Sequence, residues 1–265
     1  MKKIETVAHF GVDENLQKFL HTNYFESSLT RTLAKKILGR SQLKTISIDH
    51  HSVITNELLD LFPQLTLLIT RSVGLDHVDL DACKARDVAV YHIPDYGAHN
   101  IAEHALMLML AGSRGLTQYT TRTHAGDFSY EGFLSSALFG KTIGVVGTGR
   151  IGQALIRLLR GFDVKVLTFD VYQNKAIEEI SYVTYVPLAE LFKKSDMISL
   201  HIPLTKESHH LIDDTAIKRM KDDVVLVNTA RGAIVDESAI VKNIKKFKAV
   251  CMDVLEDEKN FNKTH

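Results

Sequence analysis

The residues with the clearest chemical meaning are three glycines in the sequence GTGRIG, which follows an apolar stretch. This spacing is typical of a turn that binds the pyrophosphate of a dinucleotide at the start of a helix. The first glycine allows a tight turn, the second lets the backbone approach the phosphates, and the third allows close packing of the helix. The predicted phosphate-binding residues are Gly147, Gly149, Arg150, Ile151 and Gly152.

An acidic residue lies at the distance that such a cofactor site requires. Asp170 ends the next apolar stretch, about 20 residues beyond the glycines. A carboxylate at that point can accept hydrogen bonds from the ribose hydroxyls and repels a 2′-phosphate, so the predicted cofactor is NAD rather than NADP. Glycine-rich turns also serve plain packing or bind flavin or S-adenosylmethionine, and these alternatives stay open.

Arg231 is the best candidate for contact with an anionic substrate, because it follows the apolar run VVLVNTA. Open α/β sheets bind ligands at the carboxyl ends of their strands. The forked guanidinium can bind a carboxylate and an adjacent oxo oxygen together, which a lysine cannot do. The alternative is a surface arginine in an ion pair.

These residues need a framework of strands and helices, and the sequence predicts one. Short apolar runs alternate with amphipathic stretches, which is typical of a parallel sheet covered by helices. We expect strands at 45–48, 65–70, 88–93, 141–147, 164–170, 197–202, 224–230 and 249–254. We expect helices at 57–62, 81–86, 151–160, 188–195, 215–220 and 237–247, together with a helix at 100–110 that is apolar on nearly every side and therefore buried on all faces.

Composition narrows the class of protein. The chain has 265 residues, of which 45% are hydrophobic and 24% charged, so two globular domains are expected. Lys plus Arg and Asp plus Glu both number 32 without a basic run, which argues against nucleic acid as a partner. No apolar stretch has the length of a membrane span, and a cytoplasmic protein is expected. Cys83 and Cys251 suggest neither a disulfide nor a thiolate site, and no two of the 13 histidines are spaced i, i+4, so no metal is expected.

Five further segments resemble the D-isomer-specific 2-hydroxyacid dehydrogenase family, in its D-lactate dehydrogenase-like branch. They are RSVGLDHVD at 71–79, PDYGAHNIAEH at 94–104, HIPLTKES at 201–208, NTARGAIVD at 228–236 and DVLEDE at 253–258. The resemblance covers nearly the whole chain. It implies a flavodoxin-like substrate domain at 1–99, a Rossmann NAD-binding domain at 100–265, both doubly wound, and a homodimer built on the NAD-binding domains.

The resemblance also implies roles for individual residues. Arg231 would bind both the oxo acid and the cofactor, and Glu258 would be the carboxylate that pairs with the acid–base histidine. Such a carboxylate raises the pKa of the imidazole that protonates the carbonyl oxygen. The other implied residues are Val73, Gly74 and Tyr96 for substrate, and His201, Ile202, Pro203, Thr229, Ala230 and Asp253 for NAD. For Tyr96 simple packing is an equal alternative, for His201 a structural role at the strand end is an equal alternative, and for Glu258 the alternative is a solvated acidic loop.

Two departures from the family pattern affect what we expect. The stretch Asn243–Ala249 lacks the usual glycine-containing turn, and the chain reaches His265 before the Pro-His segment that carries the acid–base histidine in the family. We expect an incomplete chain, without the return helix of the first domain and inactive as given. The expected reaction is reduction of pyruvate to D-lactate with NADH; the alternatives are another 2-hydroxy acid such as phosphoglycerate, or a non-catalytic NAD-binding protein or decayed dehydrogenase.

Overall fold

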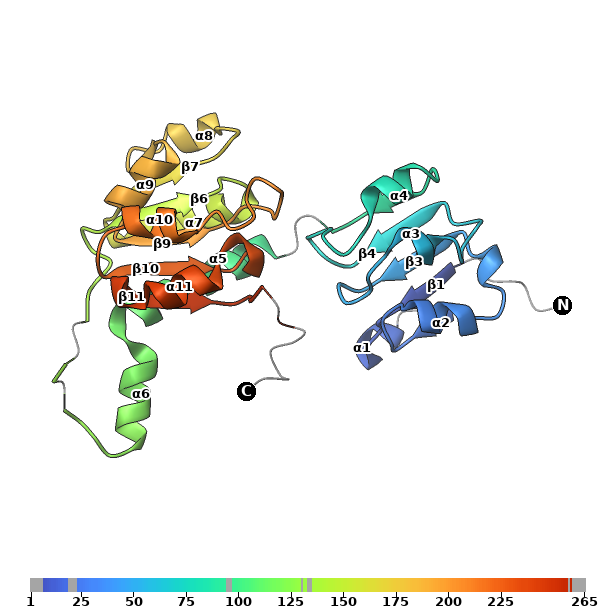
Figure 1. Ribbon diagram of the computed structural model, residues 1–265, viewed down its shortest axis with the longest axis horizontal. Coiled ribbons are helices and arrows are strands. Elements are labelled where there is room, and N and C mark those ends of the chain that lie inside the picture. Colours follow the sequence, from blue (N-terminus) through green and yellow to red (C-terminus); the bar gives the residue numbers. More distant parts are fainter. Residues whose placement is uncertain are drawn as a thin grey trace. The chain divides into compact units, whose positions relative to one another are not determined.

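The computed structural model describes residues 7–18, 23–93, 97–129, 131–132, 135–256 and 258. The chain divides into two compact units, Met1–Tyr96 and Gly97–His265. Each unit contains a parallel β-sheet whose strands are joined by helical connections (Figure 1). Parallel neighbours need such crossover connections, and the prediction of two α/β domains is confirmed.

The sheet of the first unit has the strand order β2-β1-β3-β4-β5, which is that of flavodoxin-like folds. Its strands are β1 (Val7–Phe10), β2 (Asn23–Phe25), β3 (Thr45–Ile48), β4 (Leu67–Thr70) and β5 (Ala89–Tyr91). Its helices are α1 (Glu14–Gln17), α2 (Arg31–Lys36), α3 (Asn56–Leu59) and α4 (Leu80–Lys84), with a 3-10 turn at Arg40–Gln42. Thr30, Thr55 and Asp79 cap α2, α3 and α4 by accepting hydrogen bonds from backbone N–H groups of the first turn, which fixes where these short helices begin.

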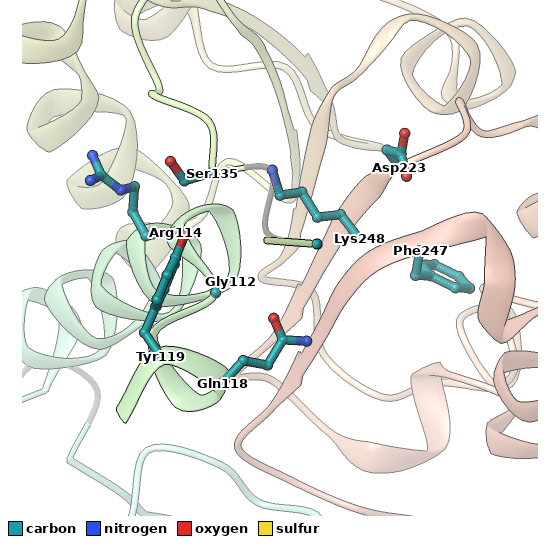
Figure 2. Close-up of a pocket in the computed structure, with 10 residues that line it drawn as sticks. Gly112, Arg114, Gln118, Tyr119, Ser135, Asp223, Phe247 and Lys248 are labelled. Atoms are coloured by element: carbon teal, nitrogen blue, oxygen red, sulfur yellow. The ribbon is translucent and has the colours of Figure 1, made fainter. Parts of the chain in front are cut away.

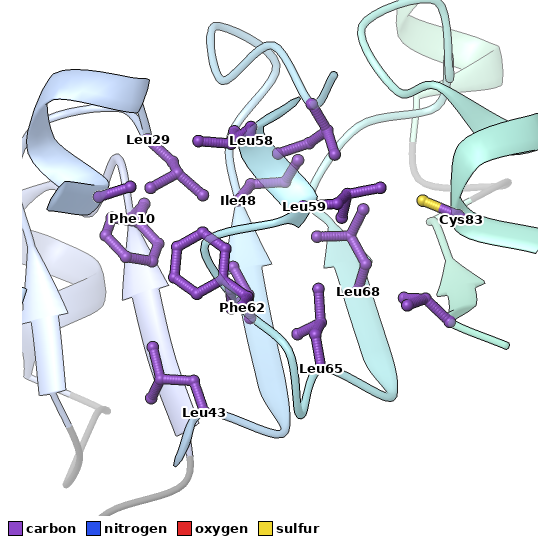
Figure 3. Packing of buried hydrophobic residues seen from close by; sticks show 14 of the residues in the cluster. Phe10, Leu29, Leu43, Ile48, Leu58, Leu59, Phe62, Leu65, Leu68 and Cys83 are labelled. Atoms are coloured by element: carbon purple, nitrogen blue, oxygen red, sulfur yellow. The ribbon is translucent and has the colours of Figure 1, made fainter. Parts of the chain in front are cut away.

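The core of the first unit is built from alternate residues of its strands and from the connecting helices (Figure 3). Phe10, Ile48 and Leu68 are fully buried on one face of the sheet, and Leu58 and Phe62 pack on them. Side chains two residues apart in a strand point to the same face, so this burial also fixes the strand register. The edge of the sheet that carries the family-like loop at 71–74 is thereby held in place.

The second unit has a six-stranded sheet with the order β11-β10-β9-β6-β7-β8, which is the Rossmann order. Its strands are β6 (Thr142–Val146), β7 (Lys165–Phe169), β8 (Val183–Tyr185), β9 (Met197–Leu200), β10 (Val224–Asn228) and β11 (Phe247–Met252). Its helices are α5 (Ala98–Arg114), α6 (Leu116–His124), α7 (Arg150–Leu159), α8 (Lys175–Glu178), α9 (Leu188–Lys194), α10 (Asp214–Arg219) and α11 (Glu237–Lys242).

Both faces of this sheet are covered. Val225 and Val227 of β10 belong to one core cluster with α5 and α7, whereas Val224 and Leu226 belong to another with α9, α10 and α11. All five residues of β10 are buried, as expected for a parallel strand between two helical layers. At Gly112 of α5 a Cβ atom would lie 2.9 Å from the sulfur of Cys251, so glycine allows the helix to approach the sheet closely.

Two predicted helices differ from the structure. The helix at 100–110 is not buried on all faces, because it packs on α7, β10 and β11 with one side only and Met107 is 50% exposed. The helix at 237–247 ends at Lys242, and a 3-10 turn at Ile244–Lys246 leads directly into β11. The edge strand β8 has no counterpart among the predicted ranges, and neither do β1, β2, α1, α2, α6 and α8. Among the described residues, no helix combines the length and the apolar character that crossing a membrane requires.

Candidate active site

The glycine turn lies where the strand order of the second sheet reverses, between β6 and β9. Val146 pairs with Leu200, so Gly147 and His201 leave the sheet side by side. Gly147 has φ +99°, and a Cβ atom there would lie 2.5 Å from the carbonyl oxygen of His201. Only glycine avoids both the strained dihedral angle and the overlap. Ligands of open α/β sheets bind at this reversal point.

The next two glycines differ in their surroundings. A Cβ atom on Gly149 would meet no atom within 4 Å, so the backbone borders open space at this position. A Cβ atom on Gly152 would instead overlap the carbonyl oxygen of Gly147, which explains why α7 can begin directly against β6. Gly149 is the N-cap of α7 and provides no side-chain cap. The N–H groups of Ile151 and Gly152 lie in the first turn of the helix, before the first intrahelical acceptor, and can face an anion.

Asp170 follows β7 and is hydrogen-bonded to the glycine turn. Its Oδ2 atom accepts hydrogen bonds from the backbone N–H of Thr148 at 2.6 Å and from the hydroxyl of Thr148 at 3.1 Å. The Tyr185 hydroxyl donates to the Thr148 hydroxyl at 2.9 Å and accepts from the Asn174 N–H at 3.0 Å. This chain of hydrogen bonds joins the glycine turn and the loop after β7 to the last residue of β8. Sequence reasoning overlooked Thr148 and Tyr185, and only the position of Thr148 between the two glycines could have drawn attention to it.

His201, Ile202 and Pro203 follow β9. The Nε2 atom of His201 is 2.8 Å from the hydroxyl oxygen of Ser199, and burial of the ring lowers the pKa of His201 to about 4. The imidazole is therefore neutral at pH 7. The hydroxyl of Ser208 donates to the carbonyl oxygen of Pro203 at 2.7 Å, which holds the loop near the strand end.

Thr229, Ala230 and Arg231 follow β10, and the side chain of the buried Asn228 is hydrogen-bonded to the backbone of Ala230 and Arg231. The Oδ1 atom of Asn228 accepts a hydrogen bond from the Ala230 N–H at 3.0 Å, and its Nδ2 atom donates to the Arg231 carbonyl oxygen at 2.8 Å. The hydroxyl of Thr229 is buried and makes no hydrogen bond to any described residue. An unsatisfied buried hydroxyl costs stability unless a ligand supplies the partner.

Arg231 lies beside a close crossing of two backbone segments. A Cβ atom on Gly232 would overlap the backbone of Leu255 and Glu256, so the segment after β11 lies directly on the loop that carries Arg231. The Nη1 atom of Arg231 donates to the Ala230 carbonyl oxygen at 2.7 Å. Gly232 is thus a glycine that the site requires for packing, which its place after the arginine in NTARG could have indicated.

Asp253 and Glu258 follow β11 and are both exposed. The backbone N–H of Asp253 donates to the Asn228 carbonyl oxygen at 3.0 Å, and its Oδ1 atom is 3.1 Å from Nε2 of His104 in α5. Glu258 accepts a hydrogen bond from the Leu255 N–H at 2.9 Å. The structure therefore places the predicted residues of the second unit at the carboxyl ends of β6, β7, β9, β10 and β11.

The predicted substrate residues other than Arg231 belong to the first unit. Val73 and Gly74 follow β4, and their carbonyl oxygens are occupied, the first by His92 at 2.9 Å and the second by the hydroxyl of Ser72 at 2.7 Å. Among the described residues their N–H groups donate to no other backbone group, so these donors are available to a carboxylate. Tyr96 lies outside the described residues.

Arg71, which begins the same family-like segment, has a structural role instead. Its guanidinium donates to the carbonyl oxygens of Phe10 and Gly11 and to the hydroxyl of Ser47, at 2.5, 2.7 and 2.7 Å. It thereby joins the ends of β1, β3 and β4. The reversal point of the first sheet, between β1 and β3, is filled by this side chain and by Asp49.

A cavity of about 310 Å³ lies elsewhere in the second unit, where α5 meets α6. Figure 2 shows Arg114, Gln118 and Tyr119 on its helical side and Phe247 and Lys248 of β11 on the other. None of the residues predicted to bind NAD or substrate lines it. The candidate site is thus the carboxyl edge of the sheet and not this cavity.

The residues at that edge fit a bound dinucleotide. Three observations support this fit: the open space at Gly149, the uncapped start of α7 and the unsatisfied hydroxyl of Thr229. The N–H groups at the start of α7 can bind an anionic pyrophosphate, and the carboxylate of Asp170, after the neighbouring strand β7, can accept hydrogen bonds from a ribose.

The chain is similar to a known protein family and to several of its members. Residues 106–265 match the model of the family described as "D-isomer specific 2-hydroxyacid dehydrogenase, NAD binding domain". The chain is 42% identical to D-lactate dehydrogenase of Escherichia coli over 192 residues, 72% of this chain and 58% of the relative. It is 36% identical to glyoxylate reductase of Thermococcus gammatolerans over 218 residues, 79% of this chain and 65% of the relative. The matches thus span less than two thirds of these relatives.

A solved structure is similar over nearly the whole chain. The crystal structure of D-lactate dehydrogenase from Aquifex aeolicus, complexed with NAD and lactic acid, superimposes with a TM-score of 0.86 at 35% identity. The match covers 98% of this chain and 81% of that chain. The similarity therefore includes both units and not the Rossmann unit alone.

Proposed function

Because this chain belongs to the D-isomer-specific 2-hydroxyacid dehydrogenase family, with an NAD-binding domain over residues 106–265, we propose that the full-length protein reduces a 2-oxo acid to the D-2-hydroxy acid with NADH. Pyruvate is the proposed substrate and D-lactate the product. The observation that carries the proposal is Arg231, which follows the unsatisfied hydroxyl of Thr229 at the carboxyl edge where the dinucleotide fits. When bound, NADH supplies the hydride for the reduction.

One set of residues is proposed to bind the successive parts of the cofactor. Gly147, Gly149 and the start of α7 at Arg150, Ile151 and Gly152 would hold the pyrophosphate, and Asp170 the ribose. His201, Ile202 and Pro203 would border the adenine end, and Thr229, Ala230, Arg231 and Asp253 the nicotinamide end. The neutral state of His201 suits this place, because a charged ring would lose its hydration in contact with an adenine.

The proposed role of Arg231 is to bind and polarise the oxo acid. Its planar fork can donate to the carboxylate and to the oxo oxygen at the same time, which turns the carbonyl carbon toward an incoming hydride. The N–H groups of Val73 and Gly74, together with Tyr96, are proposed to bind the substrate carboxylate. The reduced oxygen also needs a proton, and we propose Glu258 as the carboxylate that raises the pKa of the donating imidazole.

A second copy of the chain is the proposed partner, with α5 at the interface. One side of α5 and the start of α6 are apolar and exposed: Met107 is 50% and Leu116 is 56% exposed. These residues border a hollow with Leu106, Leu110 and Ala111. Exposed apolar patches of this kind favour association. Light scattering of the full-length protein should give the mass of a dimer, and Met107→Glu should shift it toward the monomer; a monomeric wild type would contradict the proposal.

The substrate is tested by comparing 2-oxo acids as substrates of the full-length protein with NADH. Pyruvate should give the highest kcat/KM, ahead of glyoxylate, branched and aromatic 2-oxo acids and phosphohydroxypyruvate. A higher kcat/KM for one of the others would replace pyruvate but keep the reaction. No oxidation of NADH with any of them, by a protein that binds NADH, would favour a non-catalytic NAD-binding protein.

A further inference from the structure

Two histidines and a glutamate converge in the second unit at a place that the proposed reaction does not use. His209 and His210 lie between β9 and α10, and Glu256 follows β11. Nε2 of His210 is 2.9 and 3.0 Å from the two carboxylate oxygens of Glu256, and Nε2 of His209 is 3.6 Å from the nearer one. One ligand atom from each residue lies within 4.8 Å of the other two.

The separations match those between the ligands of one tetrahedral metal ion. With zinc–nitrogen and zinc–oxygen bonds of about 2.0–2.2 Å, neighbouring ligand atoms of a tetrahedral site are about 3.3–3.5 Å apart. The two Nε2–Oε1 separations, 2.9 Å for His210 and 3.6 Å for His209, lie on either side of this value. The ligand atoms of all three residues lie within 4.8 Å of one another, so side-chain rotation that brings the two imidazole nitrogens to about 3.3–3.5 Å would place an ion among the three atoms.

The backbone brings these side chains together before any ion arrives. His210 has φ +51°, and its N–H donates to the Ala233 carbonyl oxygen at 2.8 Å. Consecutive side chains of an extended segment point to opposite sides, whereas the left-handed residue allows both imidazoles to face Glu256, with ring centroids 4.0 Å apart. The N–H of Glu256 donates to the Glu237 carboxylate at 2.8 Å. A site that is already ordered loses little entropy on binding.

An ordinary ion pair accounts for only part of this arrangement. An ion pair with Glu256 accounts for the distance of each histidine taken singly, at 2.9 Å for His210 and 3.6 Å for His209, but it does not require that both imidazoles converge on the same carboxylate. The chain also offers an internal comparison. His50 and His51 have ring centroids 3.8 Å apart, yet they belong to no group of three metal-binding side chains among the described residues.

We propose that His209, His210 and Glu256 bind one divalent cation of the zinc class, namely Zn²⁺, Co²⁺ or Ni²⁺. Two imidazoles and one carboxylate are a donor set that suits these ions, and the fourth position is left to water. The side chains of His209 and Glu256 are 50% and 35% exposed, so the ion and the water can enter from solvent.

The bound ion would also act on the loop that carries Arg231. Glu256 lies against Gly232, and His210 is hydrogen-bonded to Ala233, so the ion would join both flanking segments to the two residues that follow the arginine. Metal binding should therefore reduce local opening of this loop. Hydrogen exchange of the amides at 232–236 should become slower when the ion is added.

The test is a titration of the chelator-treated, full-length protein with Zn²⁺ by calorimetry and with Co²⁺ by absorption spectroscopy. We expect one ion per chain and the intense visible bands of four-coordinate Co²⁺. His209→Gln and Glu256→Gln should each weaken affinity by more than about tenfold, the smallest effect reported for loss of even an outer-shell partner. His209 is exposed and not part of the core, so its variant should fold even if a His210 variant does not.

The matched control is the double variant His50→Gln/His51→Gln, which removes the other histidine pair and should leave Zn²⁺ affinity unchanged. Absence of stoichiometric binding at micromolar Zn²⁺ would overturn the proposal. So would wild-type affinity in His209→Gln, or loss of binding in the control variant. NADH binding, measured on the same samples, is expected to persist in His209→Gln, so failure of the metal site can be distinguished from failure of the proposed dehydrogenase function.

Discussion

Replacement of Asp170 by alanine should change the choice between NADH and NADPH. A carboxylate offers about four acceptor positions. In the structure Thr148 takes two of them through its N–H and its hydroxyl, and the Tyr172 N–H takes a third at 3.1 Å on Oδ1. About one position, on Oδ1, is left for a ribose hydroxyl. The same charge would lie close to the 2′-phosphate of NADPH and repel it.

The magnitude follows from that remaining position. One hydrogen bond to a charged group contributes about 1.5–3 kcal/mol, which corresponds to a roughly 10- to 150-fold rise in the Kd of NADH when Asp170 is removed. NADPH loses no such bond and is relieved of the repulsion, so its Kd should stay the same or fall. The Kd of NADPH divided by the Kd of NADH should therefore fall by at least about tenfold in the variant.

The assay is a fluorescence titration of wild type and variant with each cofactor. Asp170→Ala also removes the hydrogen bonds that hold the glycine turn, so Thr148→Val is the matched control. It removes the hydroxyl contact at 3.1 Å but keeps the carboxylate, and it should weaken NADH and NADPH alike. If the NADPH-to-NADH ratio of Kd values is the same in Asp170→Ala as in wild type, the role given to Asp170 is refuted.

Three further predictions concern other positions. Arg231→Lys should lower kcat/KM for pyruvate by about 30-fold to several thousandfold, equivalent to roughly 2–5 kcal/mol, with a much smaller change in the Kd of NADH; near-normal turnover would exclude the proposed fork. Gly149→Ala should weaken NADH binding and change the free energy of unfolding by no more than about 0.5 kcal/mol. Gly232→Ala should lower the free energy of unfolding by about 1–3 kcal/mol, because its Cβ atom would overlap the backbone of Leu255. Equal thermal stability of the two variants would contradict the close backbone contact at Gly232. The pKa of His201 is about 4 in the folded protein against an ordinary value of 6.5, so the unfolded chain binds more protons between these values and stability should fall as the pH drops from 6.5 to 4, by at most about 3 kcal/mol. Urea unfolding of His201→Gln should lack this part of the pH dependence, and an unchanged profile would show that another group causes it.

The elements that the sequence predicts well are those with a strong local pattern. The glycine turn could be placed because three glycines at fixed spacing follow an apolar strand, and Asp170 because it ends the next one. The strand β8 has only three residues, too few for an alternating pattern to stand out. The helix α11 was predicted too long because the apolar spacing continues through Ile244 and Phe247, although Phe247 belongs to the sheet.

Features that depend on contacts between distant segments could not be predicted from a local pattern. Asn228 organises the arginine loop through hydrogen bonds that only the folded strand end makes possible. Histidines spaced i, i+4 mark a metal site only on a helix, whereas His209 and His210 are consecutive and Glu256 is 46 residues from His210 in the sequence. The exposed side of α5 could not be predicted, because an apolar residue pattern is the same in a helix that is buried within one unit and in a helix with one side exposed.

The stereochemistry of the product distinguishes a D-specific dehydrogenase from the other candidates. The full-length protein is incubated with pyruvate and NADH, the oxidised cofactor is measured by absorbance, and the lactate is separated on a chiral column. We expect one D-lactate for each NADH oxidised, without L-lactate. Formation of L-lactate, or no lactate from a protein that demonstrably binds NADH, would contradict it.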